Sequence, residues 1–115
     1  MPERRFAVTW AVAAVQDLEE IVAFIAADSE ANARRVLDRL RMRAASLEVS
    51  PARGRIVPEL QRAGVTGWRE ALASPYRIVY RIADRRVHVV GVFDGRRDLE
   101  DLLLLRLVRE GPATA

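Results

Sequence analysis

The chain has 115 residues, half of them hydrophobic and 30% charged, a composition that fits one soluble globular domain and excludes a disordered chain. It contains no cysteine, which excludes disulfides and thiolate metal sites; we expect a cytoplasmic protein without a cofactor or metal. All 19 basic residues are arginine and the net charge is +3, which favours binding phosphate or carboxylate over proton transfer. The leucine run 102–105 is too short to span a bilayer, so no membrane association is expected.

The first half of the chain predicts a strand followed by two helices. Residues 5–10 alternate as a short strand, and residues 11–27 then change to a helical period. Asp28 and Ser29 interrupt that pattern, and Ser29 is placed to cap a second helix over residues 30–49. Two helices joined by so short a turn are typical of an antiparallel helical hairpin.

The outer side of the second helix is rich in arginine, and Arg35, Arg39 and Arg43 are spaced four residues apart. We favour a solvated helix face whose arginines pair with Asp38 and with acidic residues of the first helix. The alternative is a nucleic-acid footprint. Like charges at this spacing repel each other slightly, and this small cost would be explained if the arginines bind phosphates.

Residues 50–66 contain several glycines and prolines and predict an irregular connector. Within it, we expect Ile56, Val57 and Leu60 to lie under the sheet. Residues 67–73 then alternate as a further strand.

A β-hairpin forms the centre of the predicted domain. Its strands are residues 76–82 and 87–93, and a two-residue turn at Asp84 and Arg85 would place Arg81 opposite His88. Alternation puts the tyrosines and isoleucines of the first strand on a buried face and its arginines on the other, which we expect to be free.

Asp98 is placed to cap a last helix, from Leu99 to about Arg109, that is apolar on more than one side. Either the helix packs across the sheet, or a partner chain covers part of it. The order is β-α-α-β-β-β-α, an α+β fold in which the helical hairpin packs on a small, mainly antiparallel sheet. We assign residues 1–110 to a single domain and residues 111–115 to a frayed tail.

The inventory of reactive side chains is thin. His88 is the only histidine, so neither a metal cluster nor a Ser-His-Asp arrangement is predicted. Cleavage of RNA would need a phosphate clamp and groups that transfer protons. Proton transfer would depend on His88, Glu70 or the two tyrosines on the apolar face. Four arginines could supply the clamp: Arg77, Arg81, Arg96 and Arg97.

Four segments together resemble the RelE/ParE superfamily of bacterial toxins, and the likeness runs from about Val8 to Leu105. The pair formed by the Tyr-Arg-Ile-Val-Tyr-Arg strand and the later Gly-Arg-Arg-Asp is the most specific part. The segments are Leu18–Ile21, Pro58–Leu60, Pro75–Arg81 and Gly95–Leu99.

The resemblance implies a toxin of a toxin–antitoxin pair, neutralised by a cognate antitoxin. RelE-like members cleave messenger RNA on the ribosome, whereas ParE-like members inhibit DNA gyrase. Arg77 and Arg97 match two phosphate-contacting arginines of the ribonucleases. Two expected lysines are replaced by Arg69 and Ala71, and an expected tyrosine falls near Leu103. The residues of these motifs are also more similar to those of the ParE branch.

We therefore expect a ParE-like toxin that inhibits DNA gyrase by binding, with Arg77, Arg81, Arg96 and Arg97 as target-binding residues. The alternative is a RelE-like, ribosome-dependent mRNA endoribonuclease, with Arg77, His88 and Arg97 as its catalytic residues. A third alternative is a domain that binds its antitoxin but has lost toxicity.

The expected partner is a ParD-like antitoxin, and contact with DNA is expected, if at all, only indirectly through the toxin–antitoxin complex. Antitoxins of this superfamily are typically partly disordered until they fold along the toxin. The residues expected to receive the antitoxin lie on the last helix: Leu102, Leu103, Leu105 and Val108.

Overall fold

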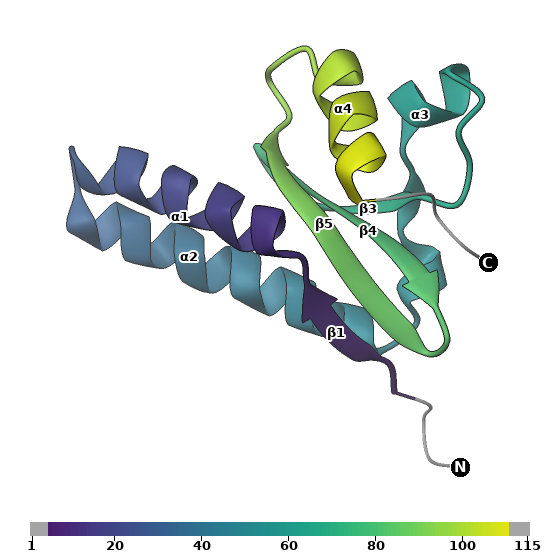
Figure 1. The fold of residues 1–115 in the computed structure, drawn as a ribbon. Helices are drawn as coiled ribbons and strands as arrows, with labels where there is room; N and C mark the ends of the chain where they lie inside the picture. Colours follow the sequence, from purple (N-terminus) through teal and green to yellow (C-terminus); the bar gives the residue numbers. More distant parts are fainter. Residues whose placement is uncertain (1–4, 111–115) are drawn as a thin grey trace.

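The structure, a computed structural model, describes residues 5–110 and is an α+β fold built on one five-stranded sheet in the order β1-β5-β4-β3-β2 (Figure 1). β1 runs parallel to β5 and every other neighbouring pair is antiparallel. The elements are β1 (Ala7–Trp10), α1 (Val12–Ala26), α2 (Glu30–Ala45), two short 3-10 helices (Ser46–Glu48 and Pro51–Arg53), β2 (Arg55–Ile56), α3 (Pro58–Arg62), β3 (Arg69–Ala73), β4 (Tyr76–Ala83), β5 (Arg86–Asp94) and α4 (Glu100–Glu110).

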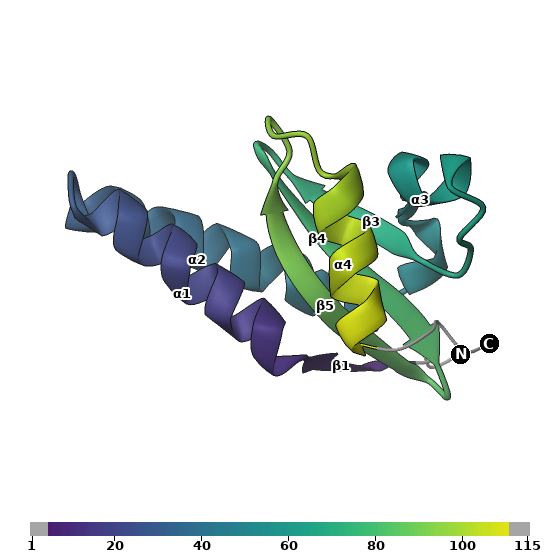
Figure 2. The same ribbon diagram turned by 45° about the horizontal axis from the view of Figure 1, so that its top comes forward.

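The predicted helical hairpin is confirmed and covers one face of the sheet. The Ser29 side chain caps α2 by accepting a hydrogen bond from the backbone N–H of Asn32 at 3.1 Å. Figures 1 and 2 show α1 and α2 side by side, with their connecting turn projecting beyond the sheet. The core on this side joins the hairpin to the sheet through buried residues that include Leu18, Leu40, Tyr76, Ile78, Tyr80, Val87 and Val89.

The predicted register of the β4–β5 hairpin is also confirmed, including the pairing of Arg81 with His88. Asp84 and Arg85 have φ angles of 50° and 62°, the left-handed pair that a two-residue type I′ turn requires. One irregularity was not predicted: Val90 is an extra residue in β5 between the two pairings that flank it. This bulge shifts the alternation of β5: Val87 and Val89 lie in the first core, whereas Val90 and Phe93 lie in a second core on the face away from α1 and α2.

The expectation that the arginine face of the hairpin is free is wrong, because α3 and α4 cover it (Figure 2). Val79 is fully buried on this face, and Arg77 retains only 8% of its exposure. A second core therefore lies between the sheet and these two helices. Its buried members are Val57, Leu60, Trp68, Val79, Val90, Phe93, Leu99, Leu103 and Leu107.

The connector of residues 50–66 is more ordered than expected, since it contains β2 and α3. Pro58 occupies the first turn of α3, where its missing N–H costs no hydrogen bond. Val57 and Leu60 are buried as predicted, whereas Ile56 is 45% exposed because it lies on the outermost strand.

A polar clamp that the sequence did not reveal ties α1 to α4 across β5. The Arg106 guanidinium donates two hydrogen bonds to the Asp17 carboxylate, at 2.7 and 2.9 Å, and lies 5.1 Å from the centre of the Phe93 ring. Asp17 also accepts from the backbone N–H of Val92 at 3.0 Å. The interaction with Asp17 raises the pKa of Arg106, so this link between the two helices stays charged.

Within residues 5–110, no helix combines the length and the apolar character needed to cross a membrane. The predicted frayed tail, residues 111–115, lies outside the described residues.

Candidate functional site

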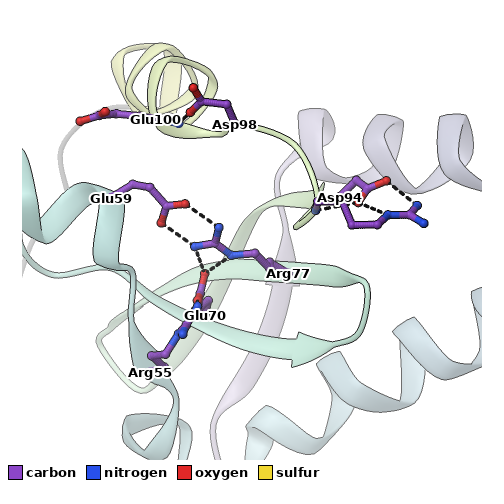
Figure 3. A network of polar contacts seen from close by, with 8 residues as sticks. Arg55, Glu59, Glu70, Arg77, Asp94, Asp98 and Glu100 are labelled. Carbon is purple, nitrogen blue, oxygen red and sulfur yellow. Dashed lines mark hydrogen bonds and ion pairs between the residues drawn. The ribbon is translucent and has the colours of Figure 1, made fainter.

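Arg77, one of the four residues predicted to bind the target, lies inside a buried ionic network (Figure 3). On β4 it is the neighbour of Leu72 on β3 and Phe93 on β5, so its side chain points under α3. Its guanidinium donates to both carboxylate oxygens of Glu59, at 2.6 and 2.7 Å, and through Nε to Glu70 at 2.7 Å. Arg77 is 8% exposed and therefore offers a target very little surface, which argues against its predicted target-binding role.

The network contains as many carboxylates as arginines. Glu70 is 1% exposed and also accepts from Arg55 Nε at 2.7 Å, so it lies between two arginines. The hydrogen bonds to Arg77 hold the pKa of Glu59 at about 2, well below its ordinary 4.5. In return, the same hydrogen bonds raise the pKa of Arg77. Both partners stay ionised at neutral pH, and the charge that would hold a scissile phosphate is neutralised from within the chain.

His88 lies in another part of the sheet. It forms a row across three strands with Arg81 on β4 and Thr9 on β1, and the Thr9 hydroxyl is 2.9 Å from its Nδ1. Burial, and then the charge of Arg81, lower the pKa of His88, so the ring is neutral at pH 7. Arg77 is four residues from Arg81 along β4, which is about 13 Å of strand. The structure therefore does not bring Arg77 and His88 together.

Arg96 and Arg97 lie in the exposed loop between β5 and α4. The Arg96 side chain donates two hydrogen bonds to Asp94, at 2.9 and 2.7 Å, and its backbone N–H donates a third at 3.0 Å. These bonds hold the pKa of Asp94 at about 2. Gly95 lies where an added Cβ would come within 2.9 Å of the Pro75 carbonyl oxygen, so the close approach of this loop to β4 requires a glycine.

The four residues predicted to receive the antitoxin divide between the inside and the outside of α4. Leu103 is 1% exposed and packs in the second core, so in this structure it offers a partner almost no surface. Leu102 is half-buried against the same core. Leu105 and Val108 are 52% and 80% exposed. The apolar excess of α4 is thus explained mainly by packing on the sheet, and only the outer two side chains are open to a partner.

The sequence did not reveal that Glu59 and Glu70 would neutralise Arg77. The Pro58–Leu60 segment belongs to the resemblance described above, but nothing in it predicts a helix start that turns Glu59 toward β4. For Glu70 a signal was present, since it occupies an inward position of a strand. A carboxylate buried in a core needs a cation beside it, so this position could have predicted an ion pair.

The chain is similar to one known protein family and to solved structures of toxin–antitoxin systems. Residues 8–99 match the family described as the ParE toxin of the type II toxin–antitoxin system parDE. The structure is similar to the chromosomal ParDE toxin–antitoxin system of P. aeruginosa, with a TM-score of 0.64 and 15% identity over 80% of this chain and 98% of that chain. It is also similar to the toxin–antitoxin complex RelBE2 of Mycobacterium tuberculosis, with a TM-score of 0.59 and 24% identity over 78% and 91% of the two chains. A search of curated proteins found no match.

Proposed function

This chain belongs to the ParE toxin family of type II toxin–antitoxin systems, and from that premise we propose that it inhibits DNA gyrase by binding and is neutralised by a cognate, ParD-like antitoxin in the cytoplasm. In this proposal the chain is a binding inhibitor and not an enzyme. Any contact with DNA is indirect, through the toxin–antitoxin complex. The alternative is a RelE-like endoribonuclease acting on messenger RNA.

The pairing of Arg77 with two carboxylates is the observation that favours a binding inhibitor over a ribonuclease. A ribonuclease needs a cation free to bind the scissile phosphate, with a proton-transfer group within hydrogen-bond reach of the reacting atoms. Here three hydrogen bonds from the guanidinium end on Glu59 and Glu70. His88 is directed instead at Thr9, about 13 Å further along the strand. The arginine that would bind the phosphate and the group that would transfer a proton are therefore separated, which supports inhibition by binding.

The arginines that remain for a target are those with exposed side chains. Arg96 and Arg97 form the exposed loop after β5, and Arg81 is half-buried beside His88. We propose Arg96 and Arg97 as the principal contacts with gyrase and Arg81 as an additional one, and we withdraw Arg77 from this set. Arginine in an exposed loop suits the carboxylates of a protein target, because its planar fork binds them through two hydrogen bonds.

The proposal is tested by a supercoiling assay with purified gyrase and this chain, with and without the product of the neighbouring gene. We expect inhibition that the neighbouring product relieves. The variant R96A/R97A should inhibit at least tenfold less well. Arg53→Ala, which removes another exposed arginine, from a 3-10 helix, should inhibit as the wild type does.

A parallel assay follows messenger RNA cleavage by the same proteins on translating ribosomes. Cleavage without inhibition of supercoiling would replace the proposal by the ribonuclease alternative. The absence of both activities would identify a domain that has lost its toxicity.

A further inference from the structure

A groove between α2 and the edge of β3 has no role in the function proposed above. It is an open groove of about 570 Å³, with one wall formed by α2 and the other by the strand edge at Leu72 and Ala73. The helix α2, which forms one wall of the groove, lies on the opposite side of the sheet from α4, the helix that the sequence indicated as the antitoxin surface (Figures 1 and 2).

Three arginines line this groove at intervals of one helical turn. They are Arg35, Arg39 and Arg43, the same row for which the sequence favoured a solvated face over a nucleic-acid footprint. One acidic side chain, Asp38, lines the groove with them, so its lining carries an excess of positive charge. A partner that fits this lining carries carboxylates.

Two of the three arginines are held toward the strand edge, and within residues 5–110 none of the three pairs with a carboxylate of the hairpin. Arg39 donates to the backbone carbonyl of Ser74 at 2.9 Å, and Arg43 Nε donates to that of Leu72 at 3.1 Å. Arg35 donates to the Asn32 side chain at 2.7 Å. The expected pairing with Asp38 and the acidic residues of α1 is therefore replaced, among the described residues, by these neutral acceptors. Their positive charges remain available to an incoming anion.

The groove also has an apolar component, which favours a peptide over a nucleic acid. Met42 is 73% exposed between the arginines, and Ala73 lies on the opposite wall. The alkyl stems of the arginines add further apolar surface. A phosphate backbone gains nothing from an exposed methionine, whereas an aliphatic side chain of a peptide gains by burying it.

The spacing of the charges indicates the conformation of the occupant. Arginines four residues apart on a helix are separated by about 6 Å along its axis. Alternate residues of an extended peptide, which share one face, are about 6.6 Å apart. In addition, β3 pairs with β2 only at Arg69 and Glu70, so the edge from Ala71 to Ala73 has no strand beside it in the described part of the chain. An extended segment therefore fits both walls.

We infer that the groove between α2 and β3 binds an extended, acidic segment of the antitoxin, with carboxylates at alternate positions facing Arg35, Arg39 and Arg43 and an aliphatic side chain on Met42. The inference depends on the proposed antitoxin partnership and deepens it, because it assigns the principal contact to this groove and not to α4. The row of three arginines spans about 12 Å, close to the roughly 13 Å that separates the first and third of three alternate positions in a five-residue extended segment.

The test uses the full chain and, as the probe, the antitoxin encoded by the neighbouring gene, with affinity measured by titration calorimetry. The charge-reversal variant R35E/R39E should bind at least a hundredfold more weakly. The matched control R34E/R41E makes the same charge change on exposed positions of α2 that line a different cavity, and should change affinity less than threefold. Met42→Ser should weaken binding roughly tenfold, since it removes an apolar contact without a change in charge.

Hydrogen exchange provides a second measurement that does not depend on a variant. The antitoxin should slow exchange of the backbone amides between Ala71 and Ser74. Equal affinity of wild type and both groove variants would overturn the groove and leave the antitoxin partnership intact. Failure of the wild type to bind the antitoxin would overturn both. Self-association of the wild type that R35E/R39E abolishes would show that a second copy occupies the groove, and would also overturn the inference.

Discussion

Replacing Glu59 by glutamine tests the account of the buried network most directly. The substitution keeps the size and planarity of the side chain but removes the negative charge that receives two hydrogen bonds from Arg77. Arg77 would then retain one ionised partner, Glu70. Removing one partner of a buried ion pair leaves an imperfectly compensated charge, which is strongly destabilising.

The magnitude follows from the pKa of Glu59, which falls from an ordinary 4.5 to about 2 in the folded chain. Each unit corresponds to about 1.4 kcal/mol, so ionised Glu59 contributes about 3 kcal/mol to the free energy of unfolding. Its side chain is only 16% exposed, so solvent screens this interaction little. Because the folded pKa is the lower one, the contribution is complete above about pH 4.5 and is lost as the pH falls toward 2.

Urea denaturation followed by tryptophan fluorescence measures this effect, since Trp68 is buried in the second core. At pH 7, Glu59→Gln should lower the free energy of unfolding by about 3 kcal/mol. The difference from wild type should shrink as the pH falls from 4.5 toward 2, because the unfolded wild-type chain then binds a proton at Glu59 that the folded chain excludes. Glu48→Gln is the control: it removes an exposed partner of Arg5 and should cost less than about 1 kcal/mol. A pH-independent difference between Glu59→Gln and wild type, or a difference at pH 7 no larger than that of Glu48→Gln, would refute this reasoning.

Three further predictions use the same structure. Asp17→Asn breaks the clamp to Arg106 and should lower the free energy of unfolding by about 3 kcal/mol in urea denaturation. Gly91→Ala should cost about 1–3 kcal/mol in the same assay, because the new methyl group would overlap the Phe93 ring; a neutral effect would contradict the packing described at the bulge. His88→Gln should inhibit growth within twofold of wild type on induced expression, since a binding inhibitor needs no proton transfer from this ring, whereas a folded but harmless variant would favour the ribonuclease.

The parts of the fold that the sequence predicted are those set by periodicity and by local turns. The helical hairpin follows from a 3.6-residue apolar stripe and from the cap at Ser29, and the register of β4 and β5 follows from the turn at Asp84 and Arg85. All of these signals lie within a few residues of the feature that they determine. The same kind of reasoning could not predict the bulge at Val90, because nothing local distinguishes that valine from its neighbours in β5.

The sequence predicted the site less well because exposure is a property of the whole fold. Alternation correctly separated the two faces of β4, but it could not say that α3 and α4 would cover the face that carries Arg77. For the same reason Leu103 and Val108, which look alike in an apolar helix, have opposite environments. The pairing of Arg77 with Glu59 joins residues 18 positions apart, and only the packing of α3 brings them together.

The network around Arg77 has a consequence for what the chain is able to bind. A phosphate could reach this guanidinium only by displacing Glu59 or Glu70, or by approaching two carboxylates that repel it. Protonation of Glu59 does not help at neutral pH, because its pKa of about 2 keeps it ionised. The chain thus neutralises with its own side chains the cation that a ribonuclease would direct at RNA. Its exposed arginines, in the loop at Arg96 and Arg97 and along α2, lie instead on surfaces that a protein target and an acidic peptide can reach.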